Sequence, residues 1–379
     1  MNILYMGPLS TLHVDDLIYN LSRVGYEVSA LNLRLSPRIF SQKVDGIDDP
    51  SRIYHLYENC DFHYDLVGRS LLMSSIGSNK LKDKVRNVLR ERKIDVILSY
   101  WGSGVFPEIR MIEKSFDVPI VHIFDSYPVS RFSFEVKLEN LYCGKAIEKL
   151  EGRIHSTTQM LEYMKKNFDL SYGSDLVFMQ WLGRRLLPKE RLKKLSGGDH
   201  QPHIVFIGNP SLEGINDVAS QINQLTQNGI HVHLCRTNRR IDAKQGFVHT
   251  FEYKSRLELM NGTFSSFLTQ FDASIILYDI KNYWSKDRYK NSTPSRFLYS
   301  LITGLPIILP QGMFTGCEQI VSQNGIGFSY KSYEELKKKI NNGEFMAWLE
   351  RNAMEKAGGF TFESNWVTLD NFLKNCALK

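Results

Sequence analysis

The stretch NSTPSRFLYSLITGLPIILP, residues 291–310, determines how the rest of the sequence is interpreted. Thr293-Pro294-Ser295-Arg296 predicts the start of a helix, because a proline in the first turn lacks only an N–H that would have no partner there. Gly304 is a typical helix stop. The apolar run after it has the composition of a strand buried on both faces. The stretch therefore predicts a helix that leads into a buried parallel strand.

The same alternation continues along the chain in both directions. At the N-terminus, an apolar strand at 2–6 precedes Val14, Leu17, Ile18 and Leu21, which repeat at helical spacing. Further helices are expected at 81–93 and 107–115, and further strands at 26–33, 95–100, 119–124, 203–207, 230–235, 247–251, 273–279 and 325–330. Strands that alternate with helices predict parallel sheets covered on both faces.

The chain length of 379 residues suits two domains of ordinary size. The basic, then Gly-rich run GRRLLPKERLKKLSGGDHQP has the composition of a linker. We therefore expect an α/β protein with two Rossmann-like, doubly wound parallel-sheet domains at 1–175 and 203–343, joined by a linker at 176–202. Helices at 344–379 are expected to pack back towards the N-terminal domain. Ligands of such sheets bind beyond the carboxyl ends of the strands, so a cleft between the two domains is the default site.

Composition narrows the functional classes. Apolar content of 42%, with no apolar run long enough for a transmembrane helix and no signal-peptide pattern at the start, predicts a globular cytoplasmic protein. Five scattered cysteines fit a reducing compartment. The net charge of +6 favours anionic partners without requiring nucleic acid. No P-loop is present, and no Gly-x-Gly-x-x-Gly follows the first strand, which argues against kinases and dehydrogenases.

Four stretches carry a resemblance to a known family. They are the opening stretch, GCEQIVSQNGIGF at 316–328, GPLSTLHVDDLIYNLSRVGYEVSAL at 7–31 and PIVHIFDSYP at 119–128. In these stretches the chain resembles glycosyltransferases of the GT-B architecture, and among them the glycosyl group 1 family. The resemblance implies transfer of a sugar from a nucleoside-diphosphate sugar to a hydroxyl of a saccharide, a lipid-linked glycan or a secondary metabolite. No cofactor besides this donor is implied.

Physical reasoning supports a diphosphate site in the C-terminal half. A diphosphate is bound well by backbone N–H groups at a helix N-terminus together with a cation, and Arg296 follows the expected helix start. Glycine turns allow the backbone to approach the phosphates. The residues expected near the donor are Gly208, Asn209, Arg236, Ser295, Arg296, Tyr299 and Glu318.

The N-terminal half is expected to hold the acceptor. Asp125 ends an apolar strand, where a carboxylate can act as general base on an acceptor hydroxyl or can orient the acceptor. His13 is the second candidate for a catalytic role, whereas His122, within the strand, is interpreted as a core histidine. The residues expected near the acceptor are Gly7, Ser10, Gly102 and Ser103.

No metal site is expected. The sequence has no Asp-x-Asp triplet and no His/Cys cluster with local metal-ligand spacing, so we expect metal-independent catalysis. The basic helix at 80–93 is a candidate for peripheral contact with an anionic membrane, at the inner face. The alternative interpretation of this helix is a solvated face packed on the sheet.

The chain also departs from the family pattern. The family often carries two glutamates eight positions apart, and Asn291 and Tyr299 stand at those positions here. Two alternatives to a glycosyltransferase therefore stay open. One is a sugar-nucleotide epimerase of the same fold. The other is a partner subunit that binds nucleotide sugar without turnover.

Overall fold

The computed structural model describes most of the chain. The described residues are 1–7, 12–32, 60–63, 74–102, 105–130, 132–208, 217–235, 241, 244–252, 254, 256–279 and 287–378. They divide into two compact units, one of Met1–Gln180 with Trp366–Lys379 and one of Trp181–Asn365. The boundary expected at 175 lies five residues before this division, and the end of the last helix belongs to the first unit.

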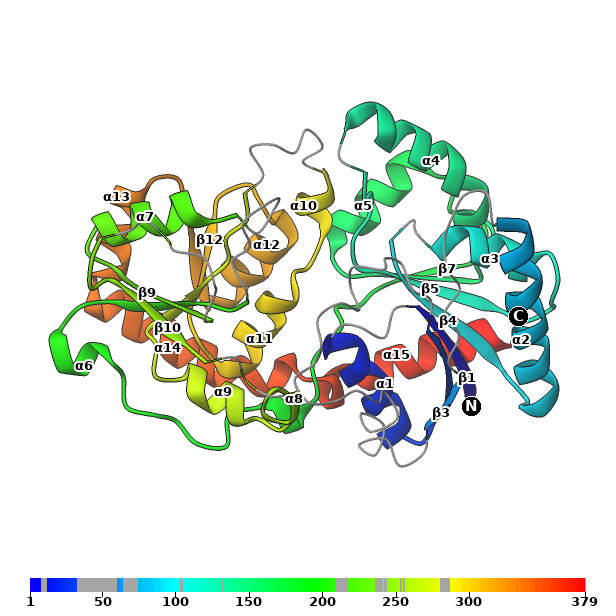
Figure 1. Ribbon diagram of the computed structural model, residues 1–379, viewed down its shortest axis with the longest axis horizontal. Helices are drawn as coiled ribbons and strands as arrows, with labels where there is room; N and C mark the ends of the chain where they lie inside the picture. The colour runs from blue at the N-terminus through cyan, green and yellow to red at the C-terminus, as the bar shows by residue number, and fades with distance from the viewer. Residues whose placement is uncertain are drawn as a thin grey trace. The chain divides into compact units, whose positions relative to one another are not determined.

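The first unit is built on a seven-stranded, all-parallel sheet (Figure 1). Its strand order is β3-β2-β1-β4-β5-β6-β7, so the order reverses between β1 and β4. The strands are β1 (Asn2–Gly7), β2 (Glu27–Asn32), β3 (Cys60–His63), β4 (Val96–Trp101), β5 (Ile120–Phe124), β6 (Gly152–His155) and β7 (Ser174–Val177). The described side chains of β1, β4 and β5 are almost all buried, as expected for central strands covered on both faces.

Helices connect these strands. They are α1 (Leu12–Arg23), α2 (Ser74–Glu91), α3 (Phe106–Glu113), α4 (Ser133–Ile147) and α5 (Thr158–Asn167), and α15 (Phe362–Ala377) adds its C-terminal part to this unit. Side chains of α2, α3, α4 and α5 share one core cluster with the strands. The helices expected at 81–93 and 107–115 are found as α2 and α3, with α2 beginning seven residues earlier.

The second unit repeats the design with six parallel strands in the order β10-β9-β8-β11-β12-β13, which reverses between β8 and β11 (Figure 1). The strands are β8 (His203–Phe206), β9 (His231–Cys235), β10 (Val248–Phe251), β11 (Ala273–Ile275), β12 (Ile307–Pro310) and β13 (Gly327–Tyr330). The prediction of two Rossmann-like, doubly wound parallel sheets is confirmed.

Most helices of the second unit are short. They are α6 (Ser196–Asp199), α7 (Ala219–Gln227), α8 (Arg256–Met260), α9 (Thr263–Leu268), α10 (Asp287–Asn291), α11 (Ser295–Thr303), α12 (Thr315–Asn324), α13 (Tyr333–Ile340) and α14 (Gly343–Ala357), with 3₁₀ turns at Arg184–Leu186 and Gly358–Phe360. A bilayer-spanning helix is not found in the described part of the chain.

The stretch 291–310 folds as its sequence predicts. Pro294 is the N-cap of α11, and Gly304 ends the helix in the left-handed conformation, with φ of 65°. The chain then turns directly into β12. Every residue of α11 after Ser295 is buried, so this helix is a core element that carries Arg296 to a fixed position.

Candidate functional site

In doubly wound sheets, ligands bind at the carboxyl ends of the strands, at the point where the strand order reverses. In the second unit this point lies between β8 and β11. The guanidinium of Arg296 lies there between two rings, 4.4 Å from the ring centre of Phe206 at the end of β8 and 4.3 Å from that of Tyr278 after β11. Its Nη1 donates a hydrogen bond to the carbonyl of Leu277 over 3.1 Å.

Arg296 is held as a cation in a largely apolar place. The residue is only 9% exposed, and burial lowers the pKa of its guanidinium below the usual value. An arginine stays protonated even so, because its usual pKa is far above neutral pH. The two rings and the carbonyl of Leu277 hold the guanidinium in place, so its position is set before any anion arrives. Stacked arginines of this kind suit recognition of phosphate.

Gly208 follows β8 beside this arginine. It has φ of 125°, and a Cβ at this position would lie 3.3 Å from Nη2 of Arg296. The backbone thus approaches the guanidinium more closely than a side chain would comfortably permit. Ser295 is the exposed first residue of α11, and Arg296 is the second. The N-terminal turn of this helix therefore lies beside the arginine. Three of the residues predicted for the donor therefore lie together.

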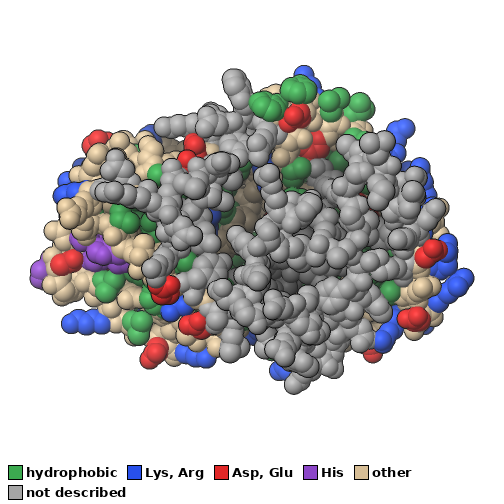
Figure 2. All heavy atoms as spheres, viewed as in Figure 1, with side chains coloured by type: hydrophobic (Ala, Val, Ile, Leu, Met, Phe, Trp, Pro, Cys, Tyr) green, Lys and Arg blue, Asp and Glu red, His purple; other side chains and the backbone are tan. Residues whose placement is uncertain are grey.

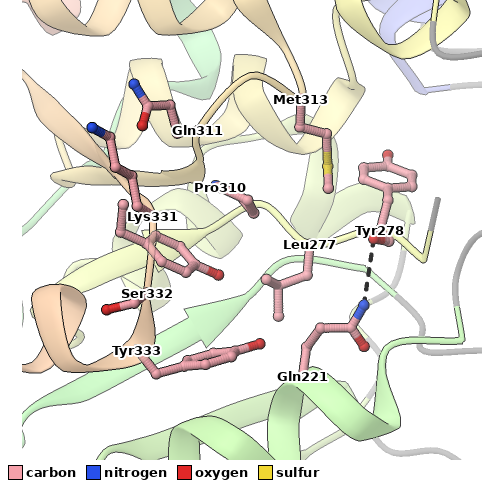
Figure 3. Close-up of a pocket in the computed structure, with 10 residues that line it drawn as sticks. Gln221, Leu277, Tyr278, Pro310, Gln311, Met313, Lys331, Ser332 and Tyr333 are labelled. Carbon is pink, nitrogen blue, oxygen red and sulfur yellow. Dashed lines mark hydrogen bonds between the residues drawn. The ribbon is translucent and has the colours of Figure 1, made fainter. Parts of the chain in front are cut away.

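A pocket of about 380 Å³ opens at the same edge of the second sheet (Figure 3). Its walls come from the segments that follow β11, β12 and β13, and from α7. They are Gln221, Leu277, Tyr278, Pro310, Gln311, Met313, Tyr330, Lys331, Ser332 and Tyr333. Gln221 Nε2 donates to the carbonyl of Tyr278 over 3.5 Å. Leu277 and Tyr278 also contact Arg296, so the pocket and the arginine share a wall.

Two other predicted donor residues have structural partners. Glu318 lies in the first turn of α12, where its carboxylate accepts N–H bonds from Gly312 and Met313, and burial raises the pKa of this carboxyl above its usual value. It thereby fixes the loop that supplies Met313 to the pocket. Tyr299 is buried in the core, where its hydroxyl donates to the carbonyl of Leu259 over 3.2 Å. Its ring packs edge-on against Phe264.

The side chains of five predicted site residues lie outside what the structure describes. Asn209, Arg236, Ser10 and Ser103 are not among the described residues, and His13 is described only as backbone in α1.

In the first unit the strand order reverses between β1 and β4, and predicted acceptor residues gather there. Gly7 ends β1, and a Cβ on it would lie 3.2 Å from the backbone oxygen of Tyr100 in β4. A Cβ on Gly102, just after β4, would lie 2.5 Å from the oxygen of Ser126. Both glycines permit close approaches that any larger residue would prevent.

Asp125 follows β5 at this edge and is half-buried beside two buried tyrosines. Burial, and then the charge of Asp125, raise the pKa of Tyr5 well above its usual value. The pKa of Tyr100 is raised for the same reasons, with a hydrogen bond to Asp125 as a further cause. Both hydroxyls therefore keep their protons, and the Tyr100 hydroxyl is hydrogen-bonded to the Asp125 carboxylate.

Trp101 is a residue that the sequence interpretation missed. It ends β4 with φ of 111°, which is a strained conformation for a bulky side chain and is found most often near functional sites. His122 helps to hold it, because its Nε2 lies 3.1 Å from the Trp101 carbonyl and its Nδ1 lies 2.7 Å from the hydroxyl of Ser99. Burial lowers the pKa of His122 to about 3, so it is a neutral core histidine, in agreement with the sequence interpretation.

Three potential metal ligands lie together in the second unit. They are Asp199, His203 and His231, whose ligand atoms all lie within 4.8 Å of one another. The two histidines face each other across the register of β8 and β9, which local spacing cannot show. This cluster lies at the amino ends of the strands, away from Arg296.

Solved structures resemble the whole chain. Sucrose-phosphate synthase from Thermosynechococcus elongatus matches with a TM-score of 0.68 at 10% identity, covering 99% of this chain and 98% of that one. The lipopolysaccharide outer core galactosyltransferase WaaB matches with 0.62 at 12% identity, covering 99% of each. A putative UDP-N-acetylglucosamine 2-epimerase from Listeria monocytogenes matches with 0.58 at 10% identity, covering 97% and 94%. No family model and no curated protein matches the sequence.

Identities this low establish the fold alone. The neighbours agree with the predicted GT-B architecture, in which one chain carries two Rossmann-like domains. Because transferases and a putative epimerase share this fold, the fold does not distinguish sugar transfer from epimerisation, and the chemistry of the site must do so.

Proposed function

We propose that this protein is a glycosyltransferase that moves a sugar from a nucleoside-diphosphate sugar to a hydroxyl of a saccharide, a lipid-linked glycan or a secondary metabolite. The observation that carries the proposal is the guanidinium of Arg296, held between the rings of Phe206 and Tyr278 at the reversal point of the second sheet. A buried, oriented cation beside a glycine and a helix N-terminus is suited to a diphosphate.

The donor half of the reaction follows from this geometry. Arg296, the backbone at Gly208 and the N-terminal turn of α11 would bind the diphosphate, and the adjoining pocket would receive the nucleoside between its tyrosines. As the bond between the anomeric carbon and the diphosphate oxygen breaks, its electron pair stays on the diphosphate. Preorganised donors at that oxygen stabilise the charge that develops.

The acceptor half would use the cluster at the reversal point of the first sheet. The acceptor hydroxyl oxygen forms the new bond to the anomeric carbon and loses its proton. Asp125 would accept this proton or would orient the hydroxyl, with Tyr100 fixing the carboxylate. At Gly7 and Gly102 a Cβ would collide with neighbouring atoms, so the two glycines allow the strand ends to pack closely around this cluster.

Metal independence is part of the proposal. Its support is that a cation and backbone N–H groups are available for the leaving diphosphate without a metal ion. Turnover that is lost on chelation and restored by magnesium or manganese would contradict it.

Contact with an anionic membrane is also proposed. The basic helix at 80–93 suggested this contact from the sequence, and α4 adds an exposed apolar face to it. Phe134, Leu138, Leu141 and Tyr142 lie on α4 and are each more than half exposed, and Figure 2 shows hydrophobic side chains gathered there. α3 packs between α4 and the basic α2, whose Arg90 is exposed. An apolar helix face near basic residues suits a bilayer with anionic head groups.

Sedimentation with vesicles tests this contact. The protein should bind vesicles rich in phosphatidylglycerol and not vesicles of phosphatidylcholine alone. Leu141→Ser with Phe134→Ser should weaken binding, whereas Leu192→Ser, which changes an exposed leucine in the second unit, should not. Equal binding by both variants would contradict a role for α4.

An epimerase is the second candidate, because a putative 2-epimerase shares the fold over 97% of this chain. The two functions differ in their need for an acceptor. We would incubate the protein with common nucleotide sugars, with and without a mixture of saccharide and lipid-linked acceptors, and follow free nucleotide and sugar identity. Release of nucleoside diphosphate that depends on acceptor supports transfer. A changed sugar still bound to nucleotide indicates epimerisation, and binding without turnover indicates a non-catalytic partner subunit.

A further inference from the structure

Four histidines lie side by side on one face of the second sheet. His203 is in β8, His231 and His233 are in β9, and His249 is in β10. The strands pair with His203 opposite His231 and His249 opposite His233, and residues two apart in a strand point to the same face. The rings stack at short distances, 4.4 Å between the centres of His203 and His231 and 4.6 Å between those of His233 and His249. Figure 2 shows histidine side chains reaching the surface of this unit.

Two of these imidazoles face one carboxylate. Asp199 Oδ2 lies 2.9 Å from Nε2 of His203 and 3.7 Å from Nε2 of His231, and the three ligand atoms all lie within 4.8 Å of one another. Ligand atoms of a tetrahedral zinc ion with bonds near 2.1 Å lie roughly 3.4 Å apart. The distances from Asp199 Oδ2 to the two imidazole nitrogens, 2.9 and 3.7 Å, lie on either side of about 3.4 Å. Small movements would therefore bring all three atoms into one coordination sphere.

The other two histidines orient the first two. Nδ1 of His203 lies 2.8 Å from Nε2 of His233, and Nδ1 of His231 lies 2.7 Å from Nε2 of His249. If Nε2 of His203 and Nε2 of His231 hold a metal, the Nδ1 of each ring carries the proton. These Nδ1–H groups then donate to His233 and His249, respectively. Metal-binding histidines almost always have such a partner on the second nitrogen, which fixes their tautomer and orientation.

The cluster is also open to solvent at Asp199. Asp199 is 42% exposed in its side chain, so an ion could enter from solvent and keep a water in a fourth position.

We propose that Asp199, His203 and His231 form a binding site for a divalent transition-metal ion, with zinc as the best fit. Two imidazoles and one carboxylate favour zinc over magnesium or calcium, which take oxygen ligands. The site joins the segment before β8 to β9 at the amino edge of the sheet, whereas Arg296 lies at the carboxyl edge. Its role is therefore to brace the second unit, and it does not depend on the proposed glycosyl transfer.

Zinc binding by protein without a histidine tag tests the proposal. The full chain is stripped with chelator, and its affinity is measured by competition with a zinc indicator. We expect one zinc per chain and a higher melting temperature with zinc than without. Asp199→Ala and His231→Ala should abolish stoichiometric binding. His249→Phe, which keeps the ring but removes the acceptor from His231, should weaken binding about 10–100-fold.

A matched control lies next to the site. His200 is an exposed histidine beside Asp199 with φ of 58°, and His200→Asn removes its imidazole with a residue that tolerates this conformation. It should bind zinc as the parent does. The proposal is overturned if the parent binds no stoichiometric zinc, or if Asp199→Ala and His231→Ala bind it unchanged. Melting temperatures are also measured in chelator. If they are similar for all variants and the parent, a variant that binds no zinc has lost the site and not its fold.

Discussion

Arg153 in β6 and Arg296 in α11 are both buried, but their guanidinium groups have different surroundings. Arg153 makes two hydrogen bonds to the carboxylate of Asp175, at 2.9 and 3.1 Å, and three to backbone carbonyls of Ile147, Leu170 and Tyr172. Arg296 lies between the rings of Phe206 and Tyr278, and its Nη1 donates to the carbonyl of Leu277.

The difference indicates what each charge is for. The anion and the carbonyls around Arg153 match its donors and tie β6 to β7, so its charge contributes to the fold. The rings around Arg296 hold its guanidinium beside a glycine, at the edge where ligands of such sheets bind. We therefore expect substitutions of Arg153 to affect stability, and those of Arg296 to affect binding.

The largest expected effect is on Arg153. Arg153→Met should lower the free energy of unfolding by about 3–5 kcal/mol, because it leaves the Asp175 carboxylate with only its bond to His155 and removes the donor to three carbonyls. Urea unfolding at neutral pH measures this. Lys149→Met is the control, since that lysine pairs with Glu113 at the surface and is 63% exposed in its side chain. A surface change of this kind should stay within about 0.5 kcal/mol. Equal losses of unfolding free energy in the two variants would contradict the view that the Arg153 charge stabilises the fold.

Arg296→Lys tests the second half. Lysine keeps the charge but has no planar group to lie between the rings, so nucleoside-diphosphate affinity should fall about 10–100-fold. Calorimetry with uridine, guanosine and adenosine diphosphates, each beside its nucleoside, measures the effect. Nucleoside binding should change little, because the pocket that would receive it is only adjacent to the arginine. If both ligand types weaken equally, the arginine supports the pocket and does not bind the diphosphate.

The sequence was sufficient to predict the alternation of elements. Apolar runs, helical spacing and glycine stops are local signals, and α11 begins and ends where Pro294 and Gly304 indicate. It also placed Gly208 and Arg296 at one site, because both residues follow predictable element boundaries.

The sequence could not show which side chains meet laterally. No local signal links Phe206 and Tyr278 to Arg296, and they hold it because β8 and β11 are neighbours in the sheet. The histidine cluster depends in the same way on the register between β8, β9 and β10. Pairing of distant strands is a tertiary property, so local periodicity does not encode these contacts.

Acid should weaken the group around Arg153. Burial alone would raise the pKa of Asp175, but hydrogen bonds from His155 and Arg153 outweigh it and hold the pKa at about 2, against a usual 3.8. The stability from this carboxylate is complete above pH 3.8 and is lost as the pH falls through 2. Burial lowers the pKa of His155 below 6.5, so its contribution is complete above that pH and declines below it.

Unfolding midpoints in urea from neutral pH down to pH 2 measure this acid effect. The Asp175 contribution is at most about 2 kcal/mol. Asp175→Asn should be less stable at neutral pH and should show a flatter decline between about pH 4 and pH 2 than the parent. A parallel decline in both proteins would mean that other groups cause the acid sensitivity.

The smallest expected effect comes from one methyl group beside Arg296. Gly208→Ala places a Cβ 3.3 Å from Nη2 at φ of 125°, so we expect a stability loss of about 1–2 kcal/mol and weaker diphosphate binding as the guanidinium shifts. Gly229→Ala is the matched control, because Gly229 also has positive φ, 79°, but nothing lies within 4 Å of its Cβ position. Both variants should lose stability, and only Gly208→Ala should lose diphosphate affinity. Unchanged affinity in Gly208→Ala would show that the position of the guanidinium is not critical, and Arg296 would then resemble Arg153 as a residue of the fold.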